Sequence, residues 1–202
     1  MTSTSKTSLA AAVTAIDELP AALPLAVVTT DLDDFQSVNV EHGHRAGDAV
    51  LAGFEKILRR NLPDDGKVIR VGGDEWVVVL PRASSEHALV VMDEIRQHIE
   101  QAGLAPGGRS ITMSAGVASR PPHGATGEEL LRCADEALFR GKREGRNRVA
   151  IYVEDRMVMK SNYYSRAALE RLSRVSRATD RTEASLLREA LDDLLARYNE
   201  QT

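Results

Sequence analysis

The sequence predicts an α+β protein, in which helices pack on a mostly antiparallel sheet and a small helical tail follows. Segments typical of strands alternate with segments typical of helices over residues 1–156. Within that part, two β-rich runs flank a Gly-Gly turn, which is the sequence signal of a hairpin. The charge then changes at Met157: residues 1–156 carry 18 basic and 23 acidic side chains, whereas residues 157–202 carry 8 and 7. We therefore expect residues 157–202 to form a second unit.

The composition excludes some classes of protein. Hydrophobic residues make up 43% of the 202 residues, which is enough for a sizeable core. No apolar run approaches the roughly 18 residues that a membrane helix needs, and the polar stretch 1–8 does not resemble a signal peptide. A lone cysteine, Cys133, excludes an internal disulfide and a thiolate zinc cluster. We therefore expect a cytoplasmic protein that makes no contact with a membrane.

The first elements follow from apolar spacing and from the residues that end each segment. The Ala-rich segment Leu9–Leu19 predicts a helix that ends near Pro20. Leu25–Thr30 is a short apolar run rich in Val and Thr, which predicts a buried strand. Asp48–Arg60 carries apolar residues at helical spacing and predicts a helix that ends before Pro63.

The next elements complete the alternation. Lys67–Val71 and Trp76–Leu80 predict two hairpin strands joined by Gly72-Gly73-Asp74-Glu75. The later elements are expected as a helix over Ser85–Gln101, a strand over Ile111–Ala118, a helix over Gly127–Lys142 and a strand over Val149–Val153. Together these segments predict one layer of helices on the sheet.

The tail has a different pattern. Met157–Tyr164 predicts a short extended stretch, and Ser165 is a good N-cap for a helix with apolar residues at Leu169, Leu172 and Val175. A second helix is expected to begin at Thr182. Because about 45 residues cannot bury much surface alone, we expect the tail to pair with another chain.

Acidic residues follow one strand and fill the hairpin turn. Asp31 ends the first strand, and Asp74 and Glu75 lie in the turn. Carboxylates at the ends of adjacent strands can share a divalent cation, and Mg²⁺ prefers one or two carboxylates together with substrate phosphates. Two such ions can activate an attacking hydroxyl and stabilise a leaving phosphate. Acidic turns are more often solvated loops, so the residues taken singly are a weak signal.

The full spacing of motifs is much more specific. Residues 22–153 strongly resemble the GGDEF family of diguanylate cyclases, and the matching motifs occur in order with suitable gaps. The matching segments are Asp31-Leu32-Asp33-Asp34-Phe35, Asn39, Gly43-His44, Gly47-Asp48, Arg70-Val71-Gly72-Gly73-Asp74-Glu75-Trp76, Ser114-Ala115-Gly116, Ala134-Asp135-Glu136-Ala137-Leu138-Phe139, Lys142 and Gly145-Arg146-Asn147.

This resemblance implies a nucleotidyl-cyclase-like domain over residues 22–156, preceded by an N-terminal helix within residues 1–21. It implies that two GTP molecules are condensed into cyclic di-GMP with Mg²⁺ or Mn²⁺ as the cofactor. The implied metal ligands are the Asp31 carboxylate, the Leu32 carbonyl and Asp74, and the implied catalytic acids are Asp74 and Glu75. The implied nucleotide-binding residues are Asn39 and Asp48 for guanine, and Phe35, Gln36, Lys142 and Arg146 for the rest of the nucleotide. Phosphoryl transfer depends mainly on positioning and charge neutralisation, which these residue types can supply.

Several positions depart from the family pattern. Gln36 replaces a phosphate-contacting Lys, Val40 replaces an Asp, and Trp76 replaces a Phe. The Asp-x-Leu-Thr-Gly-Leu segment that usually opens the domain is absent, and residues 63–66 do not supply the family's inhibitory Arg-x-x-Asp. An alternative therefore stays open: a transcription regulator whose GGDEF part binds GTP or a cyclic dinucleotide but is catalytically weak or inactive.

Residues 157–198 resemble the ribbon-helix-helix repressors. The resemblance rests on Asn162-Tyr163-Tyr164-Ser165, on Leu169 and Leu172, and on the segment from Ala178 to Leu191. It implies that residues 157–202 form a homodimer whose paired strands enter the major groove of a DNA operator.

The DNA contacts are expected at Lys160, Ser161, Tyr163, Arg181 and Thr182. Lys160–Arg181 holds six basic and two acidic residues, a local excess that favours DNA binding. A dimerisation module that binds no DNA is the alternative.

Overall fold

The computed structural model describes residues 3–153 and 164–179, with isolated positions 183, 186, 187, 190 and 197. The chain divides into two compact units, Met1–Glu154 and Asp155–Thr202. The DNA-contacting residues expected at Lys160, Ser161, Tyr163, Arg181 and Thr182 lie outside the described residues. Most of the extended stretch expected over Met157–Tyr164 and the start of the second tail helix also lie outside them.

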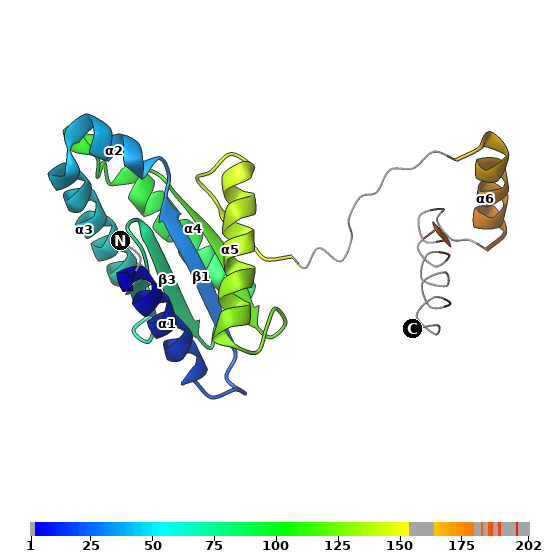
Figure 1. Cartoon of the computed structure of the whole chain (residues 1–202), viewed down its shortest axis with the longest axis horizontal. Coiled ribbons are helices and arrows are strands. Elements are labelled where there is room, and N and C mark those ends of the chain that lie inside the picture. Colours follow the sequence, from blue (N-terminus) through cyan, green and yellow to red (C-terminus); the bar gives the residue numbers. More distant parts are fainter. Residues whose placement is uncertain are drawn as a thin grey trace. The chain divides into compact units, whose positions relative to one another are not determined.

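A five-stranded sheet with the order β2-β3-β1-β4-β5 forms the centre of the first unit (Figure 1). The central strand β1 (Leu25–Leu32) pairs antiparallel with β3 (Glu75–Pro81) and with β4 (Met113–Arg120). At one edge β2 (Lys67–Arg70) pairs antiparallel with β3, and at the other β5 (Val149–Ile151) pairs parallel with β4. The expected α+β class, its mostly antiparallel sheet and the β2–β3 hairpin are therefore confirmed.

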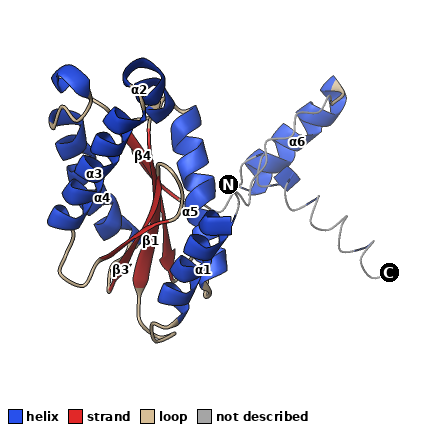
Figure 2. Ribbon diagram, turned by 60° about the vertical axis from the view of Figure 1, so that its left-hand side comes forward, coloured by secondary structure: helices blue, strands red, loops and turns tan. Residues whose placement is uncertain are grey.

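Helices cover both faces of this sheet, so the expectation of a single helical layer is wrong. Figure 2 shows α3 and α4 on one side and α1 and α5 on the other. The helices are α1 (Ser3–Asp17), α2 (Phe35–His42), α3 (His44–Asn61), α4 (Ser85–Gln101) and α5 (Gly127–Arg143), with a 3-10 turn at Pro106–Gly108. The reason lies in the strands: every residue of β4 is buried, as are all but one of β1. Strands that are covered on both faces read as continuous apolar runs, as Leu25–Val28 does.

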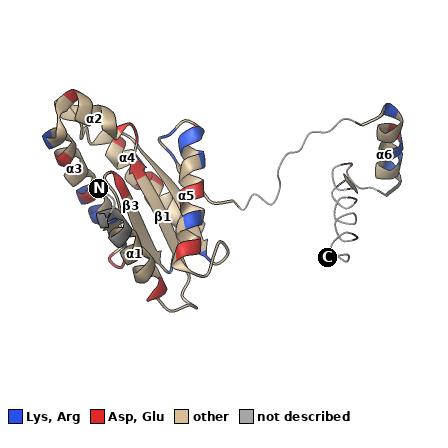
Figure 3. Cartoon of the chain, in the orientation of Figure 1, with Lys and Arg blue, Asp and Glu red and all other residues tan. Residues whose placement is uncertain are grey.

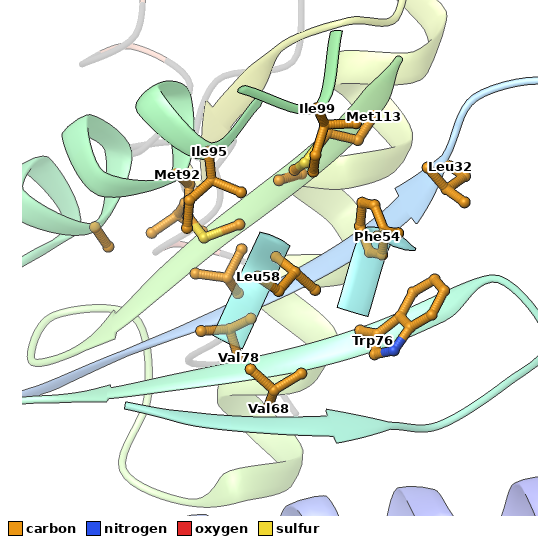
Figure 4. Packing of buried hydrophobic residues seen from close by; sticks show 14 of the residues in the cluster. Leu32, Phe54, Leu58, Val68, Trp76, Val78, Met92, Ile95, Ile99 and Met113 are labelled. Carbon is orange, nitrogen blue, oxygen red and sulfur yellow. The ribbon is translucent and has the colours of Figure 1, made fainter. Parts of the chain in front are cut away.

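The two faces carry separate hydrophobic clusters. In the first, which is drawn in Figure 4, the rings of Phe54 and Trp76 pack at an angle of 47° with their centroids 4.5 Å apart. Leu58 of α3 and Ile95 of α4 belong to the same cluster. The second joins α1 and α5 to the opposite face of the sheet. It contains Ala12, Ile16, Leu25, Val27, Val77, Val79, Ala118, Leu130, Leu131, Cys133 and Ala134.

The observed helix boundaries show which helices the local sequence pattern was able to predict. The range expected for α4 is confirmed, and its N-cap Ser84 accepts a hydrogen bond from the backbone N–H of His87 over 3.2 Å. Helix α3 begins at His44, four residues before the expected start, and α2 was not expected. Helix α2 is short, contains β-branched residues, and follows a left-handed Asp34 (φ 53°) whose side chain makes no capping hydrogen bond.

In the second unit, helix α6 (Arg166–Thr179) confirms the first of the two expected tail helices. Ser165 is its N-cap, because the backbone N–H of Ala168 donates to the Ser165 hydroxyl over 3.2 Å. Leu169 and Val175 are exposed on this helix. Among the residues that the structure describes, no helix is both long enough and apolar enough to cross a membrane.

Candidate functional site

A cleft of about 310 Å³ lies where the ends of β1 and β3 face helix α5. Asp31 at the end of β1 is the cross-strand partner of Glu75, the first residue of β3 after the Gly-Gly turn. The cleft is lined by Leu9, Thr29, Thr30, Asp31, Val71, Glu75, Trp76, Val77, Asp135, Leu138, Phe139 and Lys142. Three of the predicted site residues, Asp31, Glu75 and Lys142, therefore come together from distant parts of the chain.

Gly116 of β4 allows α5 to approach the sheet this closely. A Cβ atom on Gly116 would lie 2.0 Å from the carbonyl oxygen of Ala134 and 2.2 Å from the backbone nitrogen of Leu138. The backbone of α5 therefore passes directly over β4 at a position that admits only glycine. One and two turns further along, Leu138 and Lys142 then line the cleft.

Asp31 and Lys142 form an ion pair at the centre of the cleft. Burial raises the pKa of Asp31 to about 6, and the negative charges of Asp74 and Glu75 add to this effect, although Lys142 opposes it. The second carboxylate oxygen, Asp31 Oδ1, is buried without a hydrogen-bond partner. The site therefore holds an excess of negative charge and an acceptor oxygen whose hydrogen-bonding capacity is unused.

These residues fit a divalent cation that the nucleotide helps to hold. Asp31 Oδ1 and the carboxylate of Asp74, whose charge acts on Asp31, are hard oxygen donors of the kind that such ions prefer. Across residues 3–153 and 164–179, no group of three or more His, Cys, Asp or Glu side chains could hold a metal ion alone. Two carboxylates and the Leu32 carbonyl would leave further positions for phosphate oxygens and water.

The hairpin turn is fixed by Arg70, a residue to which the sequence analysis gave no role. Arg70 Nε donates to the carbonyl oxygens of Gly72 and Gly73, each over 3.2 Å, and its guanidinium lies 5.4 Å from the centre of the Trp76 ring. The carbonyl oxygen of Glu75 accepts hydrogen bonds from the backbone N–H groups of residues 71 and 72. These contacts fix the turn that bears Asp74 and place Glu75 where it lines the cleft.

The predicted guanine-reading residues lie on α2 and α3. A Cβ atom on Gly47 would lie 2.0 Å from Asn39 Oδ1 and 3.1 Å from the Phe35 ring, so the Asn39 side chain lies against Gly47, next to the exposed Asp48. A carboxylate and an amide on one surface could pair with both donors and acceptors of a guanine edge. The Phe35 side chain is buried in the core, so a nucleotide contact at this residue would be made by its backbone. Gln36 is exposed in the first turn of α2.

Arg146 lies in the loop that follows α5. Its Nε atom lies 3.8 Å from Asp34 Oδ1, and its backbone has a left-handed φ of 61°. Figure 3 shows that the end of α5 is rich in basic residues, which include Arg140, Lys142 and Arg143 in its last turn. Lys142 lies in the last turn of α5 and Arg146 in the loop that follows it, so both cations lie near this end of the helix.

The sequence analysis missed two acidic residues of this region. Asp33 is 5% exposed, and its carboxylate accepts hydrogen bonds from the Thr112 and Ser114 hydroxyls, each over 2.8 Å. Burial and the charge of Glu75 raise the pKa of Asp135, whereas the nearby Thr29 hydroxyl lowers it. Both residues lie inside motifs that carried the family resemblance, which was the signal that pointed to them.

Comparisons with known proteins identify a family. Residues 9–148 match the family described as "Diguanylate cyclase, GGDEF domain". Diguanylate cyclase DosC of Escherichia coli K12 is 36% identical over 131 residues, which make up 64% of this chain and 28% of DosC. The curated diguanylate cyclase of Vibrio cholerae is 33% identical, over 64% of this chain and 40% of its own length. The chain thus spans well under half the length of these relatives.

A solved structure gives the same result for the fold. The active GGEEF domain of a diguanylate cyclase from Vibrio cholerae is 33% identical with a TM-score of 0.62, covering 65% of this chain and 84% of that domain. This likeness supports the observed sheet and helices.

Proposed function

The chain belongs to the GGDEF family, whose model matches residues 9–148, and we propose that it is a diguanylate cyclase that condenses two GTP into cyclic di-GMP. The observation that carries this proposal is the convergence of Asp31, Glu75 and Lys142 on one cleft beneath the hairpin that bears Asp74. A binding module for guanine nucleotides would need the guanine-reading pair alone. A carboxylate placed to hold a cation opposite a lysine supplies the charge neutralisation that phosphoryl transfer needs as well.

In the proposed reaction the 3′-hydroxyl of each GTP attacks the α-phosphate of the other. An O–P bond forms at the α-phosphorus, the bond to the bridging oxygen of the β-phosphate breaks, and pyrophosphate leaves with that electron pair. A divalent cation held by Asp31, the Leu32 carbonyl and Asp74 would lower the pKa of the attacking hydroxyl and stabilise charge on the phosphates. Mg²⁺ and Mn²⁺ both suit such oxygen ligands.

The chain's own residues would position the nucleotide. Asn39 and Asp48 would bind the guanine edge and so select GTP over ATP. Lys142 and Arg146 would neutralise the terminal phosphates, with Lys142 exchanging its present partner Asp31 for phosphate oxygens. The N-terminus of α2, with the backbone of Phe35 and the side chain of Gln36, would face the phosphates with unpaired N–H groups. Glu75 would help to place the attacking hydroxyl.

Because each site holds one GTP, two domains must meet for reaction. The tail, residues 157–202, would supply this pairing as a homodimer and raise the effective concentration of the second domain. Helix α6 supports the proposal, because it exposes the apolar side chain of Leu169. We propose that the same tail binds a DNA operator in the manner of a ribbon-helix-helix protein. Arg166, Arg171, Arg174 and Arg177 make α6 basic (Figure 3).

The cyclase proposal is tested by incubating the full chain with GTP labelled at the α-phosphate and with Mg²⁺ or Mn²⁺, and resolving the products. Cyclic di-GMP should appear with the native chain and not with Asp74→Ala, and unlabelled ATP should not compete. GTP binding without any cyclic product at high protein concentration would favour the alternative, a nucleotide-binding regulator.

The DNA proposal is tested by a mobility shift on the promoter region of the chain's own gene. Binding should weaken steeply with added salt and weaken further in Arg181→Ala and Tyr163→Ala. The absence of a salt-sensitive shift on any DNA would reduce the tail to a dimerisation module.

A further inference from the structure

The loop that carries Arg146 is held in an unfavourable backbone conformation. Arg146 and Asn147 have left-handed φ angles of 61° and 46°. A residue other than glycine is strained in this conformation unless its surroundings fix it, and two in succession require several contacts. The backbone supplies one of them, since the N–H of Arg146 donates to the Gly141 carbonyl over 3.1 Å. Arg148 supplies another, because its Nε donates to the Arg146 carbonyl over 3.2 Å, and Asn147 supplies the contacts that reach other segments.

Asn147 is tied to two other segments of the chain. Its backbone N–H donates to Asp33 Oδ2 over 3.0 Å, and its side-chain nitrogen donates to Glu100 Oε1, also over 3.0 Å. Its side-chain oxygen accepts a hydrogen bond from Arg96 Nη1 over 2.8 Å. Asp33 is in turn fixed by the Thr112 and Ser114 hydroxyls of the neighbouring strand region. Asn147 therefore links the loop both to the end of β1 and to helix α4.

Arg96 organises the α4 side of this arrangement. Its side chain is only 15% exposed, and it bonds Asp93 Oδ1 over 2.7 Å and Glu100 Oε2 over 3.1 Å as well as Asn147. A planar guanidinium can serve three acceptors in fixed directions, which an ammonium group cannot do. Arg96 lies 51 positions before Asn147 and in none of the motifs that carried the family resemblance.

We propose that Arg96 is a positioning residue for GTP: through Asn147 it fixes the loop that directs Arg146 toward the terminal phosphates. This inference rests on the proposed function, because it assigns phosphate contact to Arg146. Without Arg96, Asn147 loses one of its two side-chain partners and Glu100 loses its cation. The Arg146 loop then samples other backbone conformations, at a cost to contacts with the β- and γ-phosphates. Contacts to guanine on α2 and α3 are unaffected.

The test compares the binding of two nucleotides by calorimetry with Mg²⁺ present. The probes are the non-reacting α,β-methylene analogue of GTP, which carries all three phosphates, and GMP, which lacks the terminal two. Arg96→Ala should weaken binding of the GTP analogue about tenfold and leave GMP binding unchanged. The matched control is Arg59→Ala. Arg59 also bonds a carboxylate on its own helix, Glu55, and a carbonyl oxygen, that of Val68, but it lies on α3.

A second variant removes the same contact from the other side. Glycine at position 147 can adopt the left-handed backbone conformation but lacks the side chain that bonds Arg96 and Glu100. Asn147→Gly should therefore also lower the preference for the GTP analogue over GMP. The double variant should lose no more than either single one, because both remove one linkage. Because Asn147→Gly leaves Arg96 paired with Asp93 and Glu100, it remains informative if Arg96→Ala fails to fold.

An unchanged ratio of the two affinities in either folded variant would overturn the inference. The ratio of the two affinities can be measured whether or not the chain forms cyclic di-GMP, so it tests the role of Arg96 separately from the cyclase proposal. If the native chain forms no cyclic di-GMP but its preference for the GTP analogue depends on Arg96, the cyclase function fails and the positioning role stands.

Discussion

The Asp31 carboxylate is buried in a site that makes its ionised form unfavourable. Burial raises its pKa to about 6, although the ion pair with Lys142 lowers it, and the charges of Asp74 and Glu75 make a smaller contribution that also raises it. A fold that keeps such a group sacrifices stability, which is common where a charge is needed for binding or catalysis. In the proposed function the cation bound by Asp31 offsets this cost.

The first prediction concerns stability without metal. The pKa of Asp31 is 3.8 in the unfolded chain and about 6 in the folded chain, so the folded state binds more protons at pH values between these two. The free energy of unfolding therefore falls as the pH rises through this window, by up to about 3 kcal/mol from this group. Asp31→Asn, which cannot ionise, should be more stable than the native chain at pH 7.5 in EDTA, and the gain should vanish near pH 4.

Urea denaturation at several pH values measures this difference. Asp34→Asn is the matched control, because Asp34 lies three residues away with 74% of its side chain exposed. It should change the free energy of unfolding little at any pH. If Asp31→Asn is no more stable than the native chain at pH 7.5, burial does not make the ionised carboxylate unfavourable.

Helix α5 supplies the side chains that complete the cleft beside the sheet. It covers β1 and β4 and presents Asp135, Leu138 and Lys142 to the cleft. Its N-terminus is fixed by a capping box, in which Thr126 accepts from Glu129 N–H and the Glu129 side chain accepts from the backbone of Thr126. Its distance from the sheet depends on Gly116, so the placement of Lys142 follows from a residue in another element.

The second prediction tests this dependence. Gly116→Ala should lower the free energy of unfolding by about 2 kcal/mol or more, because its Cβ would overlap the α5 backbone at Ala134 and Leu138. Thermal and urea denaturation measure the loss. Gly73→Ala is the control for stability, since a Cβ there meets no atom within 4 Å. An equal effect of the two substitutions would show that α5 can move away from β4 at little cost.

The sequence predicted most of the elements because their patterns are local. The apolar runs of β1 and β3, the Gly-Gly hairpin and the capped helix α4 each contain their own signal. Helix α2 could not be predicted this way, because its stability comes from packing Phe35 and Val38 against neighbouring elements. The sequence did not predict the second helical layer, because an apolar run as short as that of β1 does not by itself show whether helices cover one face of the strand or both.

The site was predicted to a similar extent. Motif spacing identified Asp31, Glu75 and Lys142, which the fold brings together. The sequence could not show that Phe35 is a core residue, because its burial depends on how α2 packs on α3. Nor could it identify Arg96, whose partners lie on α4 itself and in a loop 51 residues away.

At the scale of the whole molecule, the two units have different tasks in this account. In the proposed function, residues 1–154 would bind and position one GTP, and residues 155–202 would bring two such domains together. The reaction then depends on the concentration of domain pairs. A dimeric tail keeps that concentration high when the protein itself is dilute.

The third prediction tests this coupling. Leu169→Glu places a charge at an exposed apolar position of α6, so it should shift the dimer toward monomer in analytical ultracentrifugation without disturbing the first unit. At low protein concentration the specific rate of cyclic di-GMP formation should fall at least tenfold, and it should recover as the protein is concentrated. Ala168→Glu introduces the same charge at the neighbouring exposed position and serves as the control. If the Leu169→Glu variant is monomeric but forms cyclic di-GMP at the native rate at every concentration, the tail does not contribute to the reaction.

The most direct test of the central claim is to quantify both products of one reaction. The full chain is incubated with GTP and Mg²⁺, and cyclic di-GMP and pyrophosphate are measured together over time, beside Asp74→Ala. The account predicts two pyrophosphates for each cyclic di-GMP with the native chain and neither product with the variant. GTP that stays bound and intact, or pyrophosphate released without cyclic di-GMP, would contradict it.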